Sequence, residues 1–374
     1  MTETIPFLDL KRQTDQLGSE LAAAIGRVLE SGRFVLGEEV AAFEREFAAY
    51  CGAEEAVGIA SGTDAITLAL SALGIGAGAE VVTAANTCVP TVVGIERSGA
   101  TPVLADADPV TAMLDPASVA EVLTERTRAV VAVHLYGRCA EMEPLRSLAR
   151  RHDLRLVEDA AQAHGARLDG ARVGTLADAA AFSFYPTKNL GALGDAGAVV
   201  TNDTSVAERL RVLRSYGETR ERTSSLRGFN SRLDSLQAAV LRAKLPFLDE
   251  WNDRRRELAK LYLEQLEDVG VELPPLEPQE RHVFHLFVVR VQRRDEVRAE
   301  LSARGVETAV HYPLPVHRHP AYAHLGAERS FPVSERLCNE VLSLPLYPQL
   351  ADAEVARVVD ALREVIRTRV TIVR

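Results

Sequence analysis

Two residues of opposite charge, Asp159 and Lys188, each follow a short apolar run in this chain. The runs at 154–157 and 179–184 have the length and composition of buried strands. Ligands of an open α/β sheet bind beyond the carboxyl ends of its strands, so we expect both side chains to face one pocket. A lysine held in a turn can lose its proton and attack a carbonyl carbon, which forms a Schiff base. Asp159 would then keep a pyridine nitrogen protonated, and that ring would act as an electron sink.

Each of these two residues also has an ordinary structural interpretation. A loop lysine is usually a solvated surface charge, and an aspartate after a strand usually caps a helix or forms a turn. The choice therefore depends on the sequence around them.

A candidate anion site lies earlier in the chain, at residues 61–65 with the sequence SGTDA. The stretch follows a predicted strand at 56–60 and begins a predicted helix that runs to about Leu73. Small residues, hydroxyl groups and the unpaired N–H groups of a first helical turn suit a phosphate. The alternative is a plain helix cap with nothing bound. The glycines at 74–79 follow a helix rather than a strand, so they are not a dinucleotide fingerprint.

Short apolar runs alternate with helical patterns through the first two thirds of the chain. This rhythm predicts an α/β fold with a mostly parallel sheet that helices cover on both faces. A proline-rich stretch at 274–278 has the composition of a linker. After it we expect a strand at 284–291, a helix at 295–304, a strand at 307–310 and two further helices. We therefore predict a large domain at 1–250 and a smaller α+β domain at 251–374.

The composition limits the partners and the compartment. The 374 residues carry a net charge of −10, which argues against nucleic acid or an anionic membrane as the main partner. The start of the chain lacks a signal-peptide layout, and no apolar run is long enough to span a bilayer. The four cysteines are widely spaced without a metal-ligand pattern. We expect a cytoplasmic protein with reduced cysteines.

Three longer stretches give the chain a family resemblance. EDAAQAHGA at 158–166, SFYPTKNLG at 183–191 and GDAGAVVTND at 194–203 resemble the DegT/DnrJ/EryC1/StrS sugar aminotransferases. That resemblance implies pyridoxal 5′-phosphate (PLP) as cofactor, held on Lys188. It also implies the fold-type-I architecture, with a seven-stranded, mostly parallel sheet and a smaller C-terminal α+β domain.

The resemblance assigns cofactor contacts residue by residue. It places the phosphate at the turn that contains Gly62, Thr63 and Asp64, with further contacts from Ser183 and from Asn230 of a second copy of the chain. Gln162 would lie near the phenolic oxygen. Cys88 stands where many members have an aromatic residue that stacks on the ring, so this chain departs from the pattern there. The structural alternatives are a strand hydroxyl for Ser183 and a packing thiol for Cys88.

Substrate contacts follow from the same resemblance. Phe34 lies in a loop that approaches the active site, sometimes that of the neighbouring subunit, and Tyr185 follows the strand before Lys188. Arg220 and Arg222, in the charged surface loop at 217–226, and Arg227 just after it would suit a diphosphate. His317 belongs to a loop with three histidines and would contact the sugar. A zinc site there is disfavoured, because three prolines intervene and no acidic cluster accompanies the histidines.

The function implied by the resemblance is transfer of an amino group from an amino acid, with L-glutamate expected, to a nucleotide-linked keto sugar. PTKNLGALGDAGA at 186–198 is similar to the branch that aminates C3 of dTDP-3-keto-6-deoxyhexoses. The alternatives are C4 amination, a cyclitol ketone, a PLP-dependent dehydratase and a non-catalytic PLP-binding module. Dehydratases have a histidine at the position of Lys188, which speaks against that class. A homodimer with shared active sites is expected.

Overall fold

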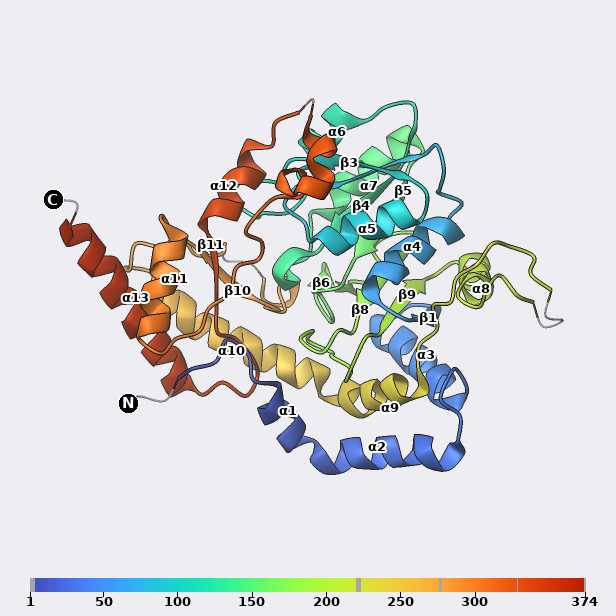
Figure 1. The fold of residues 1–374 in the computed structure, drawn as a ribbon, viewed down its shortest axis with the longest axis horizontal. Coiled ribbons are helices and arrows are strands. Elements are labelled where there is room, and N and C mark those ends of the chain that lie inside the picture. The colour runs from blue at the N-terminus through green and yellow to red at the C-terminus, as the bar shows by residue number, and fades with distance from the viewer. Residues whose placement is uncertain (1–3, 220–222, 276–277, 328, 373–374) are drawn as a thin grey trace.

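A central sheet of seven strands organises the protein (Figure 1), which is described by a computed structural model over residues 4–219, 223–275, 278–327 and 329–372. Its strand order is β1-β9-β8-β5-β4-β2-β3. β9 runs antiparallel to both of its neighbours, and the pairs among β8, β5, β4, β2 and β3 are parallel. The seven strands are β1 (Glu55–Ile59), β2 (Glu80–Ala84), β3 (Thr101–Ala105), β4 (Thr127–Val133), β5 (Arg155–Asp159), β8 (Ala179–Ser183) and β9 (Gly197–Thr201).

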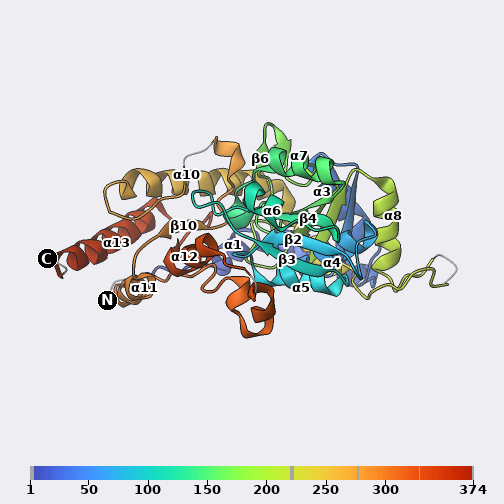
Figure 2. The same ribbon diagram turned by 90° about the horizontal axis from the view of Figure 1, so that it is seen from above.

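Helices cover both faces of this sheet (Figure 2). Alternate residues of one strand point to opposite faces: Val130 of β4 joins one apolar core and Val131 the other. Helices α3, α6, α7 and α9 pack on the face of Val130, and α4, α5 and α8 on the face of Val131. These helices are α3 (Glu38–Cys51), α4 (Gly62–Ala72), α5 (Val89–Arg97), α6 (Pro116–Val122), α7 (Met142–His152), α8 (Thr204–Leu213) and α9 (Ser235–Lys244).

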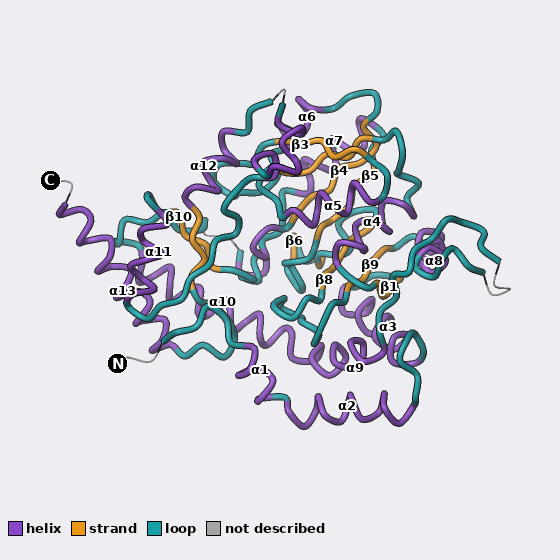
Figure 3. The backbone as a smooth tube through the Cα atoms, viewed as in Figure 1, coloured by secondary structure: helices purple, strands orange, loops and turns teal. Residues whose placement is uncertain are grey.

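The C-terminal elements form a separate apolar core beside the sheet (Figures 1 and 3). The N-terminal segment joins them, because Ile5 N donates to the carbonyl of Gly305 and Ile5 is fully buried in that core. Leu248 packs in the large core and Leu258 in the C-terminal one, so one long helix connects the two. The boundary at 250/251 stays a prediction. The elements of this core are α10 (Leu248–Leu266), β10 (Phe287–Arg290), α11 (Arg294–Ala303), β11 (Val341–Leu344) and α13 (Asp352–Ile372). The helix α12 (Pro332–Glu340) instead buries Leu337 in the large core.

The remaining elements are short or lie at the periphery. Helices α1 and α2 precede α3, and a two-stranded hairpin follows β5. Their bounds are α1 (Leu10–Gln16), α2 (Gly18–Ser31), β6 (Arg167–Leu168), β7 (Ala171–Arg172), and the 3-10 turns η1 (Leu135–Gly137), η2 (Leu245–Phe247), η3 (Gln279–Arg281), η4 (Val316–Arg318) and η5 (Pro320–Gly326).

The predicted fold class is confirmed, with one error in the C-terminal part. The segment 307–310 is not a regular strand, because only Ala309 bridges to Ser343. The partner of β10 is instead β11, which pairs with it in antiparallel register. β11 follows α12 directly, so its apolar residues continued a helical pattern in the sequence. Within the described residues, no helix is both long and apolar enough to cross a membrane.

Candidate active site

A cavity of about 250 Å³ opens beyond the carboxyl ends of β4, β5 and β8. It brings together eight of the predicted site residues, which lie up to 126 positions apart in the chain, between Gly62 and Lys188. The predicted residues in its lining are Gly62, Thr63, Cys88, Asp159, Gln162, Ser183, Tyr185 and Lys188. An acid and a lysine thus share one pocket, as the position of each after a strand predicts.

Lys188 lies on a tight turn after β8. Its backbone N–H donates to the carbonyl of Tyr185 at 2.8 Å. Gly191 closes the turn at a point where a Cβ atom would come within 2.3 Å of the carbonyl oxygen of Pro186, so a side chain cannot be accommodated there. The turn therefore holds the lysine backbone in one place.

The next residue, Asn189, fastens this turn to the rest of the protein. Its Nδ2 donates to Asn252 Oδ1 at 2.8 Å and to the carbonyl of Val283 at 3.1 Å. Its Oδ1 lies 3.1 Å from Nδ1 of His285. Asn189 is buried, so these contacts satisfy a polar group that would otherwise destabilise the fold. They tie the lysine turn to α10 and to the segment before β10.

The environment of Lys188 favours a neutral amine. The side chain is half-buried, and burial lowers the pKa of Lys188, while the nearby Cys88 and Asp159 oppose that shift. Two histidines, the buried His164 and the partly buried His311, stand close to the lysine. Burial, with the lysine charge as the second cause, lowers the pKa of His164 to about 3 and that of His311 to about 4. Both imidazoles are therefore neutral near pH 7.

Asp159 ends β5 with its carboxylate held from two sides. Oδ2 accepts a hydrogen bond from Thr91 Oγ1 at 2.8 Å, and Oδ1 accepts one from the N–H of Ala161 at 3.2 Å. Its carbonyl accepts from the N–H of His134 at 3.1 Å. Asp159 is buried yet lines the cavity, so it can present a fixed negative charge to a bound group.

The amino end of α4 forms one wall of the cavity. The Ser61 hydroxyl caps the helix by accepting from the N–H of Asp64 at 3.1 Å, and the N–H groups of the first turn have no partner within the helix. A Cβ at Gly62 would lie 2.5 Å from Cβ of Ser183, so only glycine leaves this space open. Together with the helix dipole, the wall suits an anion. The Asp64 carboxylate is not in the lining: it pairs with Arg97 and accepts from Ser231 Oγ.

Tyr312 is a lining residue that sequence reasoning missed. Its hydroxyl accepts from Gln162 Nε2 at 3.0 Å, and Gln162 Oε1 accepts from the N–H of Tyr136 at 2.6 Å. Burial raises the pKa of Cys88, and a hydrogen bond with Tyr312 opposes that shift. Tyr312 therefore brings the C-terminal part of the chain onto the active cavity. Its loop was singled out in the sequence, but the three histidines drew the prediction to His317.

Besides Asp64, three predicted residues that the structure describes do not line the cavity. Phe34 is 49% exposed, and Asn230 is exposed with a backbone bridge to Ser215. His317 is buried against the ring of Phe331, with Nε2 2.9 Å from Glu335 Oε1. Arg220 lies outside the described residues. Their roles toward substrate or cofactor stay predictions.

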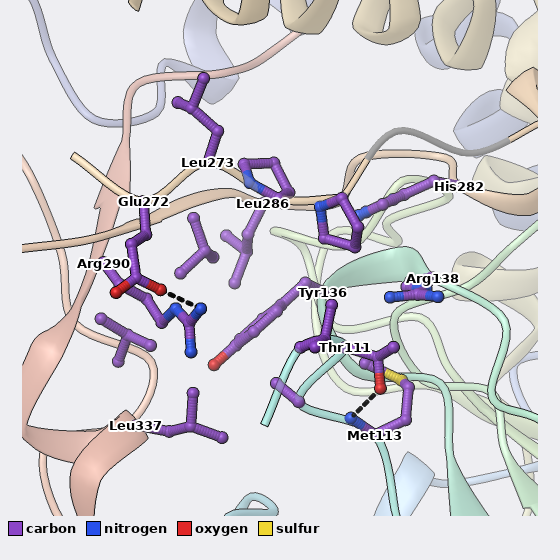
Figure 4. A pocket seen from close by; sticks show the side chains of 16 residues that line it. Thr111, Met113, Tyr136, Arg138, Glu272, Leu273, His282, Leu286, Arg290 and Leu337 are labelled. Atoms are coloured by element: carbon purple, nitrogen blue, oxygen red, sulfur yellow. Dashed lines mark hydrogen bonds and ion pairs between the residues drawn. The ribbon is translucent and has the colours of Figure 1, made fainter. Parts of the chain in front are cut away.

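A second cavity lies between the 110–113 loop and the segment that leads to β10 (Figure 4). It is much smaller, at about 40 Å³. The side chain of Tyr136 reaches into it, and the ion pair of Glu272 with Arg290 borders it. None of the predicted site residues that the structure describes is in its lining. Over the described part of the chain, no group of three or more His, Cys, Asp or Glu residues could hold a metal ion.

Comparison with known proteins identifies the family. The model of the DegT/DnrJ/EryC1/StrS aminotransferase family matches residues 15–363. A dTDP-3-amino-3,4,6-trideoxy-alpha-D-glucose transaminase from Streptomyces venezuelae is 52% identical over 365 residues, covering 97% of this chain and 96% of that protein. A dTDP-3-amino-3,6-dideoxy-alpha-D-galactopyranose transaminase from Aneurinibacillus thermoaerophilus is 48% identical over 358 residues, covering 96% and 98%.

A solved structure extends the agreement to three dimensions. The crystal structure of S. venezuelae DesV in complex with a ketimine intermediate has a TM-score of 0.95 and 51% identity, covering 98% of this chain and 99% of that chain. The family resemblance and the fold-type-I architecture predicted from the sequence are confirmed. The chain therefore belongs to the DegT/DnrJ/EryC1/StrS family and is a PLP-dependent sugar aminotransferase.

Proposed function

We propose that this chain transfers an amino group from L-glutamate to C3 of a dTDP-linked 3-keto-6-deoxyhexose. The proposal is carried by two of the relatives compared above. They are 52% and 48% identical to this chain over nearly its full length, and both are named as transaminases of dTDP-3-amino sugars. Amination at C4 and a cyclitol ketone are the alternatives to be tested.

The lining of the cavity fits PLP at three points. The space at Gly62, bounded by Ser183 and the first turn of α4, suits a phosphate, since any larger residue would fill it. Asp159 offers a buried carboxylate to a pyridine nitrogen. Lys188 offers an amine whose lowered pKa suits attack on an aldehyde. Gln162 and Cys88 line the same cavity and are candidates for contacts with the ring.

The residues that line the cavity then have defined tasks. Bound PLP supplies an electron sink for the carbanion that forms beside the transferred nitrogen. The neutral amine of Lys188 removes the proton from Cα of the amino-acid donor and later gives a proton to the sugar carbon that receives nitrogen. Asp159 keeps negative charge beside the pyridine nitrogen throughout. Ser183, Thr63 and the first turn of α4 hold the phosphate end in place.

The direct test supplies purified protein with glutamate and, separately, with a dTDP-3-keto-6-deoxyhexose, a dTDP-4-keto-6-deoxyhexose and a cyclitol ketone. We expect an amino sugar only from the 3-keto substrate, with the nitrogen placed on C3 by NMR of the product. A product from the 4-keto sugar alone would contradict the proposal. Replacing glutamate with other amino acids identifies the donor.

We further propose that two copies of the chain form a homodimer with shared active sites. An exposed apolar patch lies near the start of α9. It consists of three large side chains that are 46–49% exposed, Phe34, Val35 and Leu193. The backbone of Phe34 bonds to Ser235 and that of Leu193 to Gln237, which keeps the three together. Leu193 follows the lysine turn, so a partner that covers this patch would lie beside the cavity.

Mixed dimers test the shared site. Lys188→Ala and Asn230→Ala are each expected to lose activity as pure proteins. When the two are unfolded and refolded together, random pairing restores one complete site in each mixed dimer, or about a quarter of all sites. Recovery of activity near that level supports a site completed by Asn230 of the second copy. No recovery in mixed dimers verified by mass spectrometry would exclude it.

We also propose a cytoplasmic location. Its support is that Cys51, Cys88, Cys139 and Cys338 are all free thiols and that three of them are buried, a pattern suited to a reducing compartment. Fractionation of the producing cells with an antibody to the chain would test it, and recovery outside the cytoplasmic fraction would contradict it.

A further inference from the structure

A chain of hydroxyl groups leads to the carboxylate of Asp159. Thr91, in the first turn of α5, lies 2.8 Å from Asp159 Oδ2 through its Oγ1, and the Oγ1 atoms of Thr87 and Thr91 are 3.0 Å apart. Thr87, Thr91 and Asp159 are 2%, 1% and 5% exposed. The three groups therefore interact where water competes little for their hydrogen bonds, which strengthens each of them.

The direction of these hydrogen bonds follows from the number of protons. A carboxylate only accepts, so the single hydroxyl proton of Thr91 must point to Asp159. Thr91 then has only its lone pairs left for Thr87, and Thr87 must be the donor of the second bond. The order is Thr87 to Thr91 to Asp159, with each bond polarised toward the carboxylate.

We infer that Thr91, oriented by Thr87, is a positioning residue that holds the Asp159 carboxylate. In this role it keeps the proton between Asp159 and the pyridine nitrogen of bound PLP on the nitrogen. Hydrogen bonds donated to a carboxylate stabilise its charged form. Two protein donors, Thr91 Oγ1 and the N–H of Ala161, act on the two oxygens of Asp159. Transfer of the proton from the pyridine nitrogen to the carboxylate is therefore less favourable in free energy.

This inference deepens the proposed function at its cofactor end. It rests on bound PLP and does not depend on which sugar is aminated. Asp159 touches the ring, whereas Thr91 acts through Asp159, so the two residues differ in kind. The chain gives Thr91 a matched pair of substitutions: valine keeps the shape of threonine and removes the hydroxyl, and serine keeps the hydroxyl.

The experiment loads the full-length protein with PLP that carries ¹⁵N in the pyridine ring and records the nitrogen chemical shift before any substrate is added. For Thr91→Val we expect a shift toward the value of unprotonated pyridine, and a dissociation constant for PLP about tenfold higher, the effect of one lost hydrogen bond to a charged group. Thr91→Ser is expected to match the parent in both. Thr87→Val is expected to move the nitrogen shift in the same direction, with an affinity loss of about threefold.

The outcomes separate proton placement from packing. An unchanged nitrogen shift in Thr91→Val overturns the inference, even if PLP affinity falls, because packing alone then explains the loss. Thr91→Ser behaving like Thr91→Val also overturns it. If Thr91→Val does not fold, Thr87→Val is the deciding variant. A change in its nitrogen chemical shift supports the inference, and an unchanged nitrogen shift overturns it. Because no sugar is present, failure here is distinct from failure of the substrate assignment, which product analysis reports.

Discussion

The floor of the active cavity and its rim are built in different ways. The floor consists of Thr91, Asp159, Gln162 and Lys188. Contacts within the same chain hold it in place: the Asp159 carboxylate accepts two hydrogen bonds, and both the oxygen and the nitrogen of the Gln162 amide are hydrogen-bonded. We call the rim a set of four residues, Phe34, Tyr185, Leu193 and Asn230, of which Tyr185 lines the cavity. The other three would reach an active site only through the proposed dimer. These four residues are exposed, with Tyr185 at 52% and Leu193 at 46%.

The difference teaches where precision is needed in such an enzyme. Proton transfer requires donor and acceptor atoms within a few tenths of an ångström of their working positions, and buried, satisfied polar groups supply that rigidity. Recognition of a sugar can use exposed side chains, which vary without disturbing the fold. The two relatives named above differ in their sugars while remaining 3-amino sugar transaminases. We therefore expect chemistry to depend on the floor and substrate preference on the rim.

Substitution of Lys188 should have the largest effect. Lys188→Ala removes the amine that carries the proton, so we expect turnover to fall by about 10⁴-fold, the upper range for a general acid–base group. Single-turnover amination under saturating PLP measures this loss. Thermal unfolding should be close to that of the parent, because the substitution removes a half-buried amine for which no side-chain hydrogen bond is described.

A rim substitution serves as the contrast. Phe34→Ala, on a side chain that is half-exposed, should raise KM for the sugar and leave PLP affinity unchanged. If Phe34→Ala weakens PLP binding as strongly as it weakens sugar binding, the separation of floor from rim is wrong.

The glycine at the phosphate wall should have the next largest effect. In Gly62→Ala the new methyl group would lie 2.5 Å from Cβ of Ser183, so the helix start or β8 must move. Overpacking of this kind costs up to about 3 kcal/mol, and we expect a loss of PLP affinity of about a hundredfold. Equilibrium titration with PLP measures it.

Gly26→Ala is the matched control for this substitution. Gly26 lies inside α2 with no atom within 4 Å of an added Cβ. Alanine there should stabilise the helix by about 1 kcal/mol and leave PLP affinity unchanged. Equal losses of affinity in the two variants would show that the wall at Gly62 is not the phosphate site.

The sequence predicted the floor better than the rim, for a physical reason. Asp159 ends one strand and Lys188 lies on the turn after another. Because parallel strands deliver their carboxyl ends to one edge of the sheet, topology brings the two together. The start of α4 could be predicted as an anion wall in the same way. Thr91 escaped prediction because its role depends on the direction in which α5 leaves β2, which no local pattern encodes.

The C-terminal part shows a second limit. Tyr312 reaches the cavity only because its segment crosses from the small core to the large one, a long-range contact without a periodic signal. β11 was missed because its pairing with β10 joins residues more than 50 positions apart. His317 was predicted from its chemistry, but in this fold its nitrogen Nε2 is engaged by Glu335. A residue type suggests a role only where the backbone path is also known.

The buried Lys244, which lies outside the cavity, tests how the rigidity of the floor is maintained. Lys244 ends α9 and is 2% exposed, with Nζ donating to the carbonyl of Gly191 at 2.8 Å and to Gln13 Oε1 at 3.0 Å. Gly191 closes the turn that carries Lys188, so Lys244 supports the floor from outside the cavity. No carboxylate is among its described hydrogen-bond partners, and burial lowers the pKa of Lys244 to about 8.

This gives the smallest expected effect, a dependence of stability on pH. An unfolded lysine has a pKa of about 10.4, so between pH 8 and that value the unfolded chain binds more protons than the folded one. Folding stability contributed by Lys244 therefore rises with pH across this window. Relative to Lys244→Met, the parent protein should gain about 2 kcal/mol in free energy of unfolding from pH 8 to pH 10, measured by urea denaturation. Parallel pH profiles for the two proteins would mean that the lysine stays charged in the fold up to pH 10, and would contradict the lowered pKa.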